Sequence, residues 1–390
     1  MLRLFLTGQW YALRLWLQAW ISPWRERRSF IGAASIVVLW PAFVALQWLH
    51  LAGFALDELL FRGWRRVAVR QPLFVLGPPR SGTTHLHHVL ALDETTTTFR
   101  LWECLFGLSV TGRKLALALT AADRRLGRPG ARLLDGLAQR VNQGMSDVHP
   151  FALDAPEEDF LVLMPVMQCF ILVTLFPRAE WLWDTARLDR QDNATRRRLM
   201  RYYRICVQKH LYTFGPDQRF LSKNASFSGM AESLLETFPD AHIIACDRDP
   251  LATVPSQLSS LRPALQASGF AEIPAALQRR LIDLLAFYYL HLDRVAQAHP
   301  ANLVIVDNTA LKQRLAETVR AAFAHLKRES DKAFHAALAT ADRASRDHRS
   351  AHHYGLAEFG LDKAELNQRL AAVIELRRRR QPCTVAQVDG

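Results

Sequence analysis

Short apolar runs alternate with longer amphipathic segments through most of the chain. The runs have the length of strands and lie at 73–76, 219–222, 242–246 and 302–307. The segments that separate them repeat apolar residues at helical spacing, for example over 113–140, 192–214, 275–298 and 311–345. Buried strands that alternate with helices are typical of an α/β protein with a parallel sheet. We therefore predict a three-layer α/β/α fold with a central parallel sheet.

Ligands of such folds bind beyond the carboxyl ends of the strands. The pattern therefore directs attention to the residues that follow Leu76, Leu221, Cys246 and Val306. Polar motifs follow two of these positions, Leu76 and Cys246.

The first 70 residues follow a different pattern. From Ser29 to Leu56 no residue is charged, and this run exceeds the roughly 20 apolar residues that a helix needs to cross a bilayer. Pro41 lies in the middle of the run, where it would kink the helix or turn it back on itself. Tryptophan favours membrane interfaces, and seven of the ten tryptophans are residues 10, 16, 20, 24, 40, 48 and 64.

We therefore predict a helical, membrane-associating segment over residues 1–70, a main domain over 71–375, and a basic and then polar tail over 376–390. Whether residues 29–56 span the membrane, re-enter it or lie on it stays open. The alternative is a pair of soluble helices that bury their apolar faces on the main domain or on a second subunit.

Charge and cysteine usage narrow the function further. Half of the net charge of +12 lies in residues 1–70, which hold nine arginines against three acidic residues. Because this excess flanks the apolar run, it favours anionic lipid over nucleic acid as the partner. The five cysteines are scattered, without metal-ligand spacing, which fits a reducing compartment and predicts neither a disulfide framework nor a metal site.

The run at 73–76 is followed by a loop of the phosphate-binding type. Gly77, Gly82 and Thr84 occupy three marked positions of the pattern G-x-x-x-x-G-K-[ST], but Thr83 stands where nucleotide hydrolases have lysine. The only cation in the loop is Arg80. Backbone N–H groups and the start of the next helix would form an anion site, with hydroxyl groups from Ser81, Thr83 and Thr84.

A second phosphate grip follows the run at 242–246. In "CDRDPLATVPSQLSSL", Arg248 leaves the predicted sheet and Ser256 lies about two helical turns later. An arginine and a serine placed in this way can hold one phosphate between them. Two separate grips indicate a ligand that is phosphorylated at two places.

Together these motifs resemble the sulfotransferases that use 3′-phosphoadenosine 5′-phosphosulfate (PAPS). The resemblance covers about residues 72–370. Within it, the sequence pattern is similar to that of the large, mostly bacterial branch related to tyrosylprotein sulfotransferases. It includes "LWECLF" (101–106), "HPFALDAPEEDF" (149–160), "LSKNASFSGMAESLLETFPDAHIIACDRDP" (221–250) and "HHYGLAEFGL" (352–361). It implies transfer of a sulfuryl group to a hydroxyl or an amine, without a metal.

The resemblance also implies roles for individual residues. The 5′-phosphosulfate would be held by Arg80, Ser81, Gly82, Thr83 and Thr84, and the 3′-phosphate by Arg248 and Ser256. Lys223 matches the family lysine that meets the transferring group, and Glu103 lies where related enzymes carry their base. With Arg80, these two would be the catalytic residues. The rival candidates for the base are Glu157, Glu158 and His85.

The sequence departs from the family pattern in two segments. "VIVDNTALKQ" lacks the tyrosine and the acidic-leucine pattern that often follow the fourth strand. "SRDHRSAHHYG" has no glycine-rich loop, so that a contact from Arg349 to the 3′-phosphate is only suggested.

Two other classes of protein compete with this interpretation. A kinase or NTPase with an unusual loop is disfavoured because the loop lysine is missing and Asp307 is the only candidate for a Walker-B aspartate. A non-catalytic membrane scaffold is disfavoured because Arg80, Glu103 and Lys223 are all present.

The acceptor does not follow from the fold. A membrane-bound N-terminus with its main domain facing the cytoplasm favours a lipid or glycolipid over a soluble small molecule. A homo-oligomer is compatible with the sequence.

Overall fold

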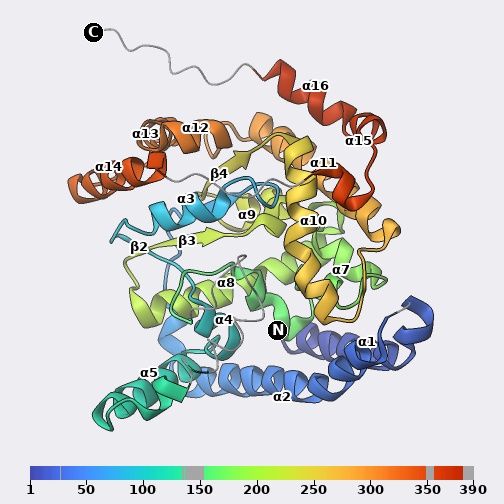
Figure 1. Ribbon diagram of the computed structural model, residues 1–390. Coiled ribbons are helices and arrows are strands. Elements are labelled where there is room, and N and C mark those ends of the chain that lie inside the picture. The colour runs from blue at the N-terminus through green and yellow to red at the C-terminus, as the bar shows by residue number, and fades with distance from the viewer. Residues whose placement is uncertain (27, 134–135, 137–152, 348–354, 381–390) are drawn as a thin grey trace.

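Five parallel strands form the centre of the computed structural model, which describes residues 1–26, 28–133, 136, 153–347 and 355–380 (Figure 1). Their order is β2-β3-β1-β4-β5. The strands are β1 (Leu73–Leu76), β2 (Thr96–Thr97), β3 (Arg219–Lys223), β4 (His242–Asp247) and β5 (Leu303–Asp307). The predicted α/β fold with a parallel sheet is confirmed. The sequence pattern missed β2, because two threonines are too short to show a hydrophobic period.

The register brings the functional strand ends together. Val75 of β1 lies opposite Lys223 of β3, and Leu76 lies opposite Ala245 of β4. The loop after β1, the last residue of β3 and the residues after β4 therefore share the carboxyl edge of the sheet.

Helices cover both faces of the sheet (Figure 1). Leu73 and Val75 pack against one layer, and Phe74 and Leu76 against the other, because side chains alternate along a strand. The first layer is α3 (Thr83–Leu90), α12 (Asn308–Gln313), α13 (Leu315–His325) and α14 (Lys332–Asp347). The second layer includes α8 (Asn193–Phe214), α9 (Ala231–Thr237), α10 (Pro250–Ala267) and α11 (Ala275–Ala298).

Shorter elements complete the described part of the chain. The remaining α-helices after the N-terminal pair are α4 (Leu101–Phe106), α5 (Val110–Arg125), α7 (Glu180–Thr185), α15 (Lys363–Arg369) and α16 (Ala371–Arg379). Two 3-10 helices matter for the site, η2 (Asp159–Val166) and η3 (Phe170–Thr174). The others are η1 (Arg62–Arg66), η4 (Leu188–Arg190), η5 (Ala225–Met230) and η6 (Leu356–Phe359).

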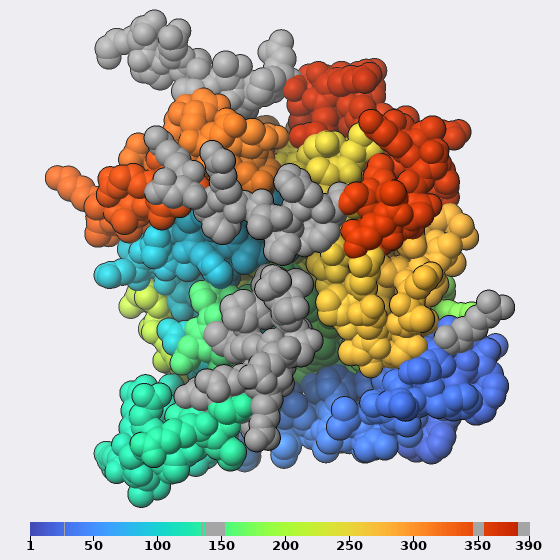
Figure 2. All heavy atoms as spheres, in the orientation of Figure 1, coloured from blue at the N-terminus to red at the C-terminus, as the bar shows by residue number. Residues whose placement is uncertain are grey.

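The N-terminal segment is a hairpin of two long helices, α1 (Leu2–Glu26) and α2 (Phe30–Leu60). It forms the lower edge of the molecule in Figures 1 and 2. The indole N–H of Trp40 donates to the Ala12 carbonyl oxygen across the hairpin at 2.9 Å. One face of the hairpin joins the main core through Leu15, Ile36 and Phe54. Helix α2 continues through Pro41, so the chain does not turn back there.

By length and composition, α2 is the one described helix that could cross a membrane, and 28% of its apolar window is buried inside the protein. This is weak evidence, because a core helix of a soluble protein passes the same test.

Some expected element boundaries are wrong. The segment 311–345 is not one helix: α12 ends at Gln313, and α13 is followed by Lys327 with a φ of 50°. Helix α5 stops at Arg125, before Gly127 and Arg128, which both have positive φ. Residues 376–379, the first residues of the segment expected as the tail, lie in α16, which ends at Arg379. Arg377 lies 2.8 Å from the Asp247 carboxylate, an ion pair that the local sequence could not reveal.

Candidate active site

The loop after β1 is held in a shape that requires glycine at two positions. Gly77 has a φ of 138°, and a Cβ there would lie 2.4 Å from the carbonyl oxygen of Cys246. Gly82 has a φ of 99°, and its Cβ would lie 2.4 Å from Nδ2 of Asn308. Between them, Arg80 adopts a φ of 68°, in the left-handed region that is uncommon for a side chain of this kind. The loop is therefore wrapped tightly between β4 and α12.

The same loop ends at the N-terminus of α3, where Gly82 provides no side-chain cap. The first N–H groups of a helix have no partner within the helix and attract anions. Asn308 fixes this end of the loop by donating from Nδ2 to the Ser81 carbonyl oxygen at 2.7 Å. The Ser81 side chain is buried beneath the loop, and its hydroxyl has no partner in the described part of the chain. The loop therefore presents its backbone, Thr83 and Thr84 to a ligand.

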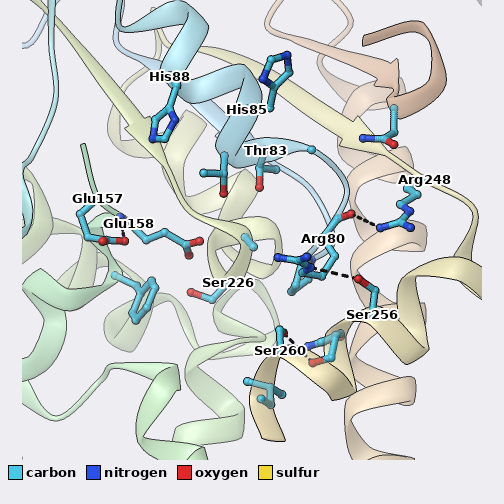
Figure 3. A pocket seen from close by; sticks show the side chains of 18 of the residues that line it. Arg80, Thr83, His85, His88, Glu157, Glu158, Ser226, Arg248, Ser256 and Ser260 are labelled. Carbon is cyan, nitrogen blue, oxygen red and sulfur yellow. Dashed lines mark hydrogen bonds between the residues drawn. The ribbon is translucent and has the colours of Figure 1, made fainter. Parts of the chain in front are cut away.

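The two predicted phosphate grips are in direct contact (Figure 3). Arg80 donates from Nε to Ser256 Oγ at 3.2 Å, and Arg248 donates from Nη1 to the Arg80 carbonyl oxygen at 2.8 Å. The Asp249 carboxylate caps α10 and so fixes the direction in which the helix leaves β4. A pair of motifs that lie 168 residues apart in the sequence thus forms one site.

The site is electropositive. Burial and the neighbouring Arg80 lower the pKa of Arg248. Burial and Arg248 also lower the pKa of Lys312, which comes from α12 and lines the same cavity. Within the described residues, no carboxylate pairs with Arg80, Arg248 or Lys312. Three cations without an ion-pair partner among the described residues, next to a helix N-terminus, form a site for a multiply charged anion.

These residues line one end of a cavity of about 950 Å³. This is the upper part of the range for small-molecule sites. The labelled side chains of Arg80, Thr83, Arg248, Ser256, Glu157, Glu158 and Ser226 surround one space in Figure 3. The lining also includes the apolar side chains of Phe160, Phe170, Ile171, Val173, Leu261, Leu265, Leu277 and Leu281. Leu265 lies about 13 Å from Ser256 along α10, so we call this part of the lining the apolar end of the cavity.

Lys223 is connected to this cavity by an ion pair with Glu158. Its Nζ lies 2.6 Å from Glu158 Oε1, and Glu158 lines the cavity while Lys223 itself is buried behind it. The next residue, Asp159, accepts hydrogen bonds from Tyr203 and Asn224 and is completely enclosed. Burial raises the pKa of Asp159 to about 6. These contacts tie the 157–159 segment to the end of β3.

Glu103 departs from the sequence-based expectation, because the structure does not bring it to the cavity. Its Oε2 lies 2.9 Å from Arg113 Nε and 2.7 Å from His210 Nδ1, and its Oε1 accepts from the Arg100 backbone N–H at 3.1 Å. Burial raises the pKa of Glu103, but the combined effect of His210 and Arg113 is larger and lowers it overall. Glu103 is therefore an ionised, internally satisfied carboxylate.

His210 completes that network, and burial lowers its pKa although the neighbouring Glu103 acts to raise it. Because an ionised carboxylate only accepts hydrogen bonds, His210 Nδ1 donates to Glu103 Oε2, and Nε2 lies 2.9 Å from the Thr97 hydroxyl. Arg113 brings a permanent positive charge to the network. The three rival candidates for the base, Glu157, Glu158 and His85, all line the cavity.

Sequence analysis missed Lys312 and Asn308. Both lie in α12, which begins directly after β5, and the rule that sites follow parallel strands pointed to this position. Arg349 lies outside the described residues, as do parts of the motifs at 149–160 and 352–361.

Comparison with known proteins decides the family. A family model described as "Sulfotransferase family" matches residues 72–332, about two thirds of the chain. The chain belongs to the sulfotransferase family. No curated protein matches the sequence.

Two solved mycobacterial sulfotransferases share the fold of this sulfotransferase. STF1 from Mycobacterium tuberculosis H37Rv aligns with a TM-score of 0.71 at 19% identity, over 94% of this chain and 93% of its own. STF9 from Mycobacterium avium aligns with a TM-score of 0.70 at 18% identity, over 90% of this chain and 86% of its own.

Proposed function

We propose that this sulfotransferase moves the sulfuryl group of PAPS to a hydroxyl group of an apolar acceptor that is held in the membrane. The observation that carries the proposal is the contact between the two phosphate grips, Arg80–Ser256 and Arg248–Arg80, at the polar end of a cavity that continues into an apolar region. PAPS carries phosphate at both the 5′ and the 3′ position, which matches two adjoining cationic sites.

The donor residues divide between the two phosphates. The N-terminus of α3, Arg80, Thr83 and Thr84 would hold the 5′-phosphosulfate, and Ser81 and Gly82 would contribute backbone groups rather than side chains. Arg248 and Ser256 would hold the 3′-phosphate, joined by Lys312. A sulfuryl donor has less charge to neutralise than a nucleoside triphosphate, so these donors can replace the missing loop lysine and a metal.

The reaction forms one S–O bond and breaks another. The acceptor oxygen attacks sulfur, the bond between sulfur and the 5′-phosphate oxygen breaks, and 3′,5′-ADP leaves with the electron pair. We assign to Lys223 the stabilisation of negative charge on that bridging oxygen. Because Glu158 lines the cavity and Glu103 does not, we assign the acceptor proton to Glu158. As Lys223 turns from Glu158 to the donor, the carboxylate is released to act as the base.

The apolar end of the cavity supports an apolar acceptor. Helix α10 carries Ser256 at the donor end and Leu265 at the apolar end, about 13 Å apart along its axis. One turn beyond Leu265, the Gly269 carbonyl oxygen accepts from the Ser29 N–H of the hairpin at 2.8 Å. The apolar end therefore points toward the segment that we expect at the membrane, with the catalytic domain on its cytoplasmic side.

The donor assignment predicts a selective loss of affinity. Arg248→Ala and Ser256→Ala should weaken binding of 3′,5′-ADP by about 10- to 100-fold, since hydrogen bonds to a charged group contribute about 1.5–3 kcal/mol. Binding of 5′-AMP, which lacks the 3′-phosphate, should change by less than about threefold. Isothermal titration calorimetry measures both. Arg262→Ala, on the same helix but in an exposed ion pair with Glu358, is the matched control. Equal affinity of wild type and the double variant for 3′,5′-ADP would rule out the assignment.

The same ligands separate this proposal from a kinase or an NTPase. Ligand binding raises the midpoint of thermal unfolding by an amount that grows with the logarithm of the ratio of ligand concentration to dissociation constant. We expect 3′,5′-ADP to stabilise the protein and Mg-ATP to have little effect. A non-catalytic scaffold would bind donor poorly and transfer nothing.

The apolar end predicts a dependence on acceptor chain length. With PAPS and a series of primary alcohols from butanol to dodecanol, KM should fall about three- to fourfold per methylene until the apolar end is full, because each buried methylene contributes about 0.8 kcal/mol. In the Leu265→Trp variant, KM should stop falling at a shorter alcohol than in wild type, and the affinity for 3′,5′-ADP should not change. Leu290→Trp, at a position on α11 that is 41% exposed, is the control. A KM that does not depend on chain length would contradict an apolar acceptor site.

A further inference from the structure

Helix α1 exposes a continuous apolar stripe. Its members recur every three or four residues, which places them on one side of a helix. Their exposed fractions run from 45% for Leu13 to 70% for Trp24. The stripe consists of Leu2, Leu6, Trp10, Leu13, Leu17, Trp20 and Trp24. The opposite side is buried in the protein through Phe5, Ala12, Leu15 and Ala19.

Helix α2 exposes a second stripe that carries no charge. Ile31, Val38 and Leu59 are each more than 70% exposed, and Leu39, Leu49 and Leu60 more than 60%. The stripe follows a helix of 31 residues, about 45 Å long. The two stripes meet at the hairpin turn, where the exposed rings of Trp24 and Phe30 touch edge to face at 5.4 Å. We call these two stripes together the apolar foot.

The other side of α2 is fixed to the catalytic domain along its length. Ile36, Trp40 and Phe54 belong to the main hydrophobic core. The His50 ring bonds to the Leu105 carbonyl oxygen at 3.0 Å. Near the end of the helix, the buried Asp57 carboxylate pairs with Lys209 at 2.5 Å and accepts the N–H groups of Val110 and Thr111.

This attachment is incompatible with a helix that crosses a bilayer. A crossing helix would separate from the domain or carry it into the hydrocarbon, and either event breaks contacts along the whole of α2. Separation would also leave the charges of Asp57 and Lys209 without partners, which costs several kcal/mol. The exposed stripes can meet lipid only if the hairpin lies parallel to the membrane surface.

The composition of the foot favours a bilayer over a second protein. Protein interfaces are on average only slightly more apolar than the rest of a surface. The foot instead combines uncharged apolar side chains with three exposed tryptophans, Trp10, Trp20 and Trp24, and a fourth, Trp48, is exposed on α2. Tryptophan is enriched where hydrocarbon meets head groups. Exposed arginines border the foot and complement anionic lipid, namely Arg3, Arg14, Arg25, Arg62, Arg65 and Arg66.

We propose that α1 and α2 lie flat in the interface of an anionic bilayer, with the apolar foot in the acyl region and neither helix crossing it. The catalytic domain then stands on the membrane, with the apolar end of its cavity next to the hairpin. The proposal does not depend on the reaction, because its test measures membrane binding and depth.

The first experiment is flotation of the full chain with vesicles of POPC that contain about 30 mol% POPG. We expect the protein to float with them, and to bind pure POPC more weakly. Leu39→Asp and Leu49→Asp should each lower the partition coefficient about tenfold or more, because burying one leucine contributes a factor of this order. Leu290→Asp, outside the foot, should bind as wild type does.

The second experiment distinguishes lying flat from crossing. The four described cysteines are buried, so single labelling sites can be placed in a Cys383→Ser background. An NBD fluorophore is attached at Ile31→Cys, Val38→Cys, Leu49→Cys and Leu56→Cys, which are exposed positions from the beginning to the end of α2. Quenching is compared for lipids that carry doxyl groups at acyl carbon 5 or carbon 12.

A flat helix gives the same shallow depth at all four positions, with stronger quenching from carbon 5. A crossing helix gives the greatest depth at Val38 and Leu49 and a shallow depth at Ile31 and Leu56, and this result would overturn the proposal. So would a failure to float combined with a dimer in analytical ultracentrifugation that Leu39→Asp dissociates, because the foot would then be covered by a second copy.

Discussion

Lys223→Ala should lower kcat by about 10²- to 10³-fold, the loss typical of removing one donor that stabilises developing charge. Affinity for 3′,5′-ADP should change by less than about threefold. The reason is that Lys223 lies behind Glu158 before the reaction and would meet the bridging oxygen as charge develops there. An interaction made only in the transition state changes kcat and leaves ground-state binding unchanged. Single-turnover kinetics with PAPS and calorimetry with 3′,5′-ADP measure the two quantities.

Lys332→Ala is the matched control, since Lys332 is an exposed lysine on α14. A variant of Lys223 that loses donor affinity and kcat in equal proportion would show that the lysine holds the ground state. If Lys223→Ala has the same kcat as wild type, the transferring sulfuryl group does not lie at the end of β3 and the assignment is wrong.

Glu103→Ala should lower the free energy of unfolding by about 3–5 kcal/mol, the usual cost of removing one partner from a buried ion pair. Arg113, whose side chain is 0% exposed, would keep its charge without a carboxylate next to it. Urea denaturation of wild type and variant measures this difference. Glu103→Gln keeps the size of the side chain and should show most of the loss, because the lost property is the charge.

The pH dependence of that difference has a defined sign. The pKa of Glu103 is lower in the folded protein than its ordinary value. A carboxylate of this kind stabilises the fold above its unfolded pKa, and the contribution disappears as the pH falls through the folded pKa. The stability gap between wild type and Glu103→Gln should therefore be full near pH 7 and shrink below about pH 4.

Glu158→Gln provides the comparison that separates structure from chemistry. Glu158 is partly exposed, with 22% of its side chain accessible, but Lys223 is only 3% exposed and would lose its carboxylate partner. We expect turnover to fall by about 10²-fold or more, as for loss of a general base, with a smaller loss of unfolding free energy than Glu103→Gln shows. If Glu103→Gln abolishes turnover and leaves stability intact, the base is Glu103 and the assignment to Glu158 is wrong.

The sequence alone predicted the layout of the proposed donor site because its signals are local. Gly77 and Gly82 permit the positive φ angles that the loop needs, and the short apolar run before them is the strand β1. Arg248 and Ser256 were placed by helical spacing after another such run. Once parallel strands are inferred, their carboxyl ends share one edge, so these segments had to converge.

The tertiary structure decided those features of the site that depend on contacts between segments far apart in the sequence. The motif around Glu103 suggested a base, but the direction of its side chain is set by Arg113 and His210, the latter 107 residues away in the sequence. Lys312 became a donor-site candidate only when α12 packed beside the loop. The apolar end of the cavity likewise exists only where η3, α10 and α11 meet.

The N-terminal hairpin shows the same division. Its apolar composition was evident from the sequence and led to the prediction that it associates with a membrane. Composition could not distinguish a crossing helix from one that lies along the surface, because both are apolar over the same length. The buried pair of Asp57 and Lys209 and the core contacts of Trp40 and Phe54 make that distinction. Such contacts join residues up to 152 positions apart, and a hydrophobic pattern records only that a side chain avoids water, not which neighbour covers it.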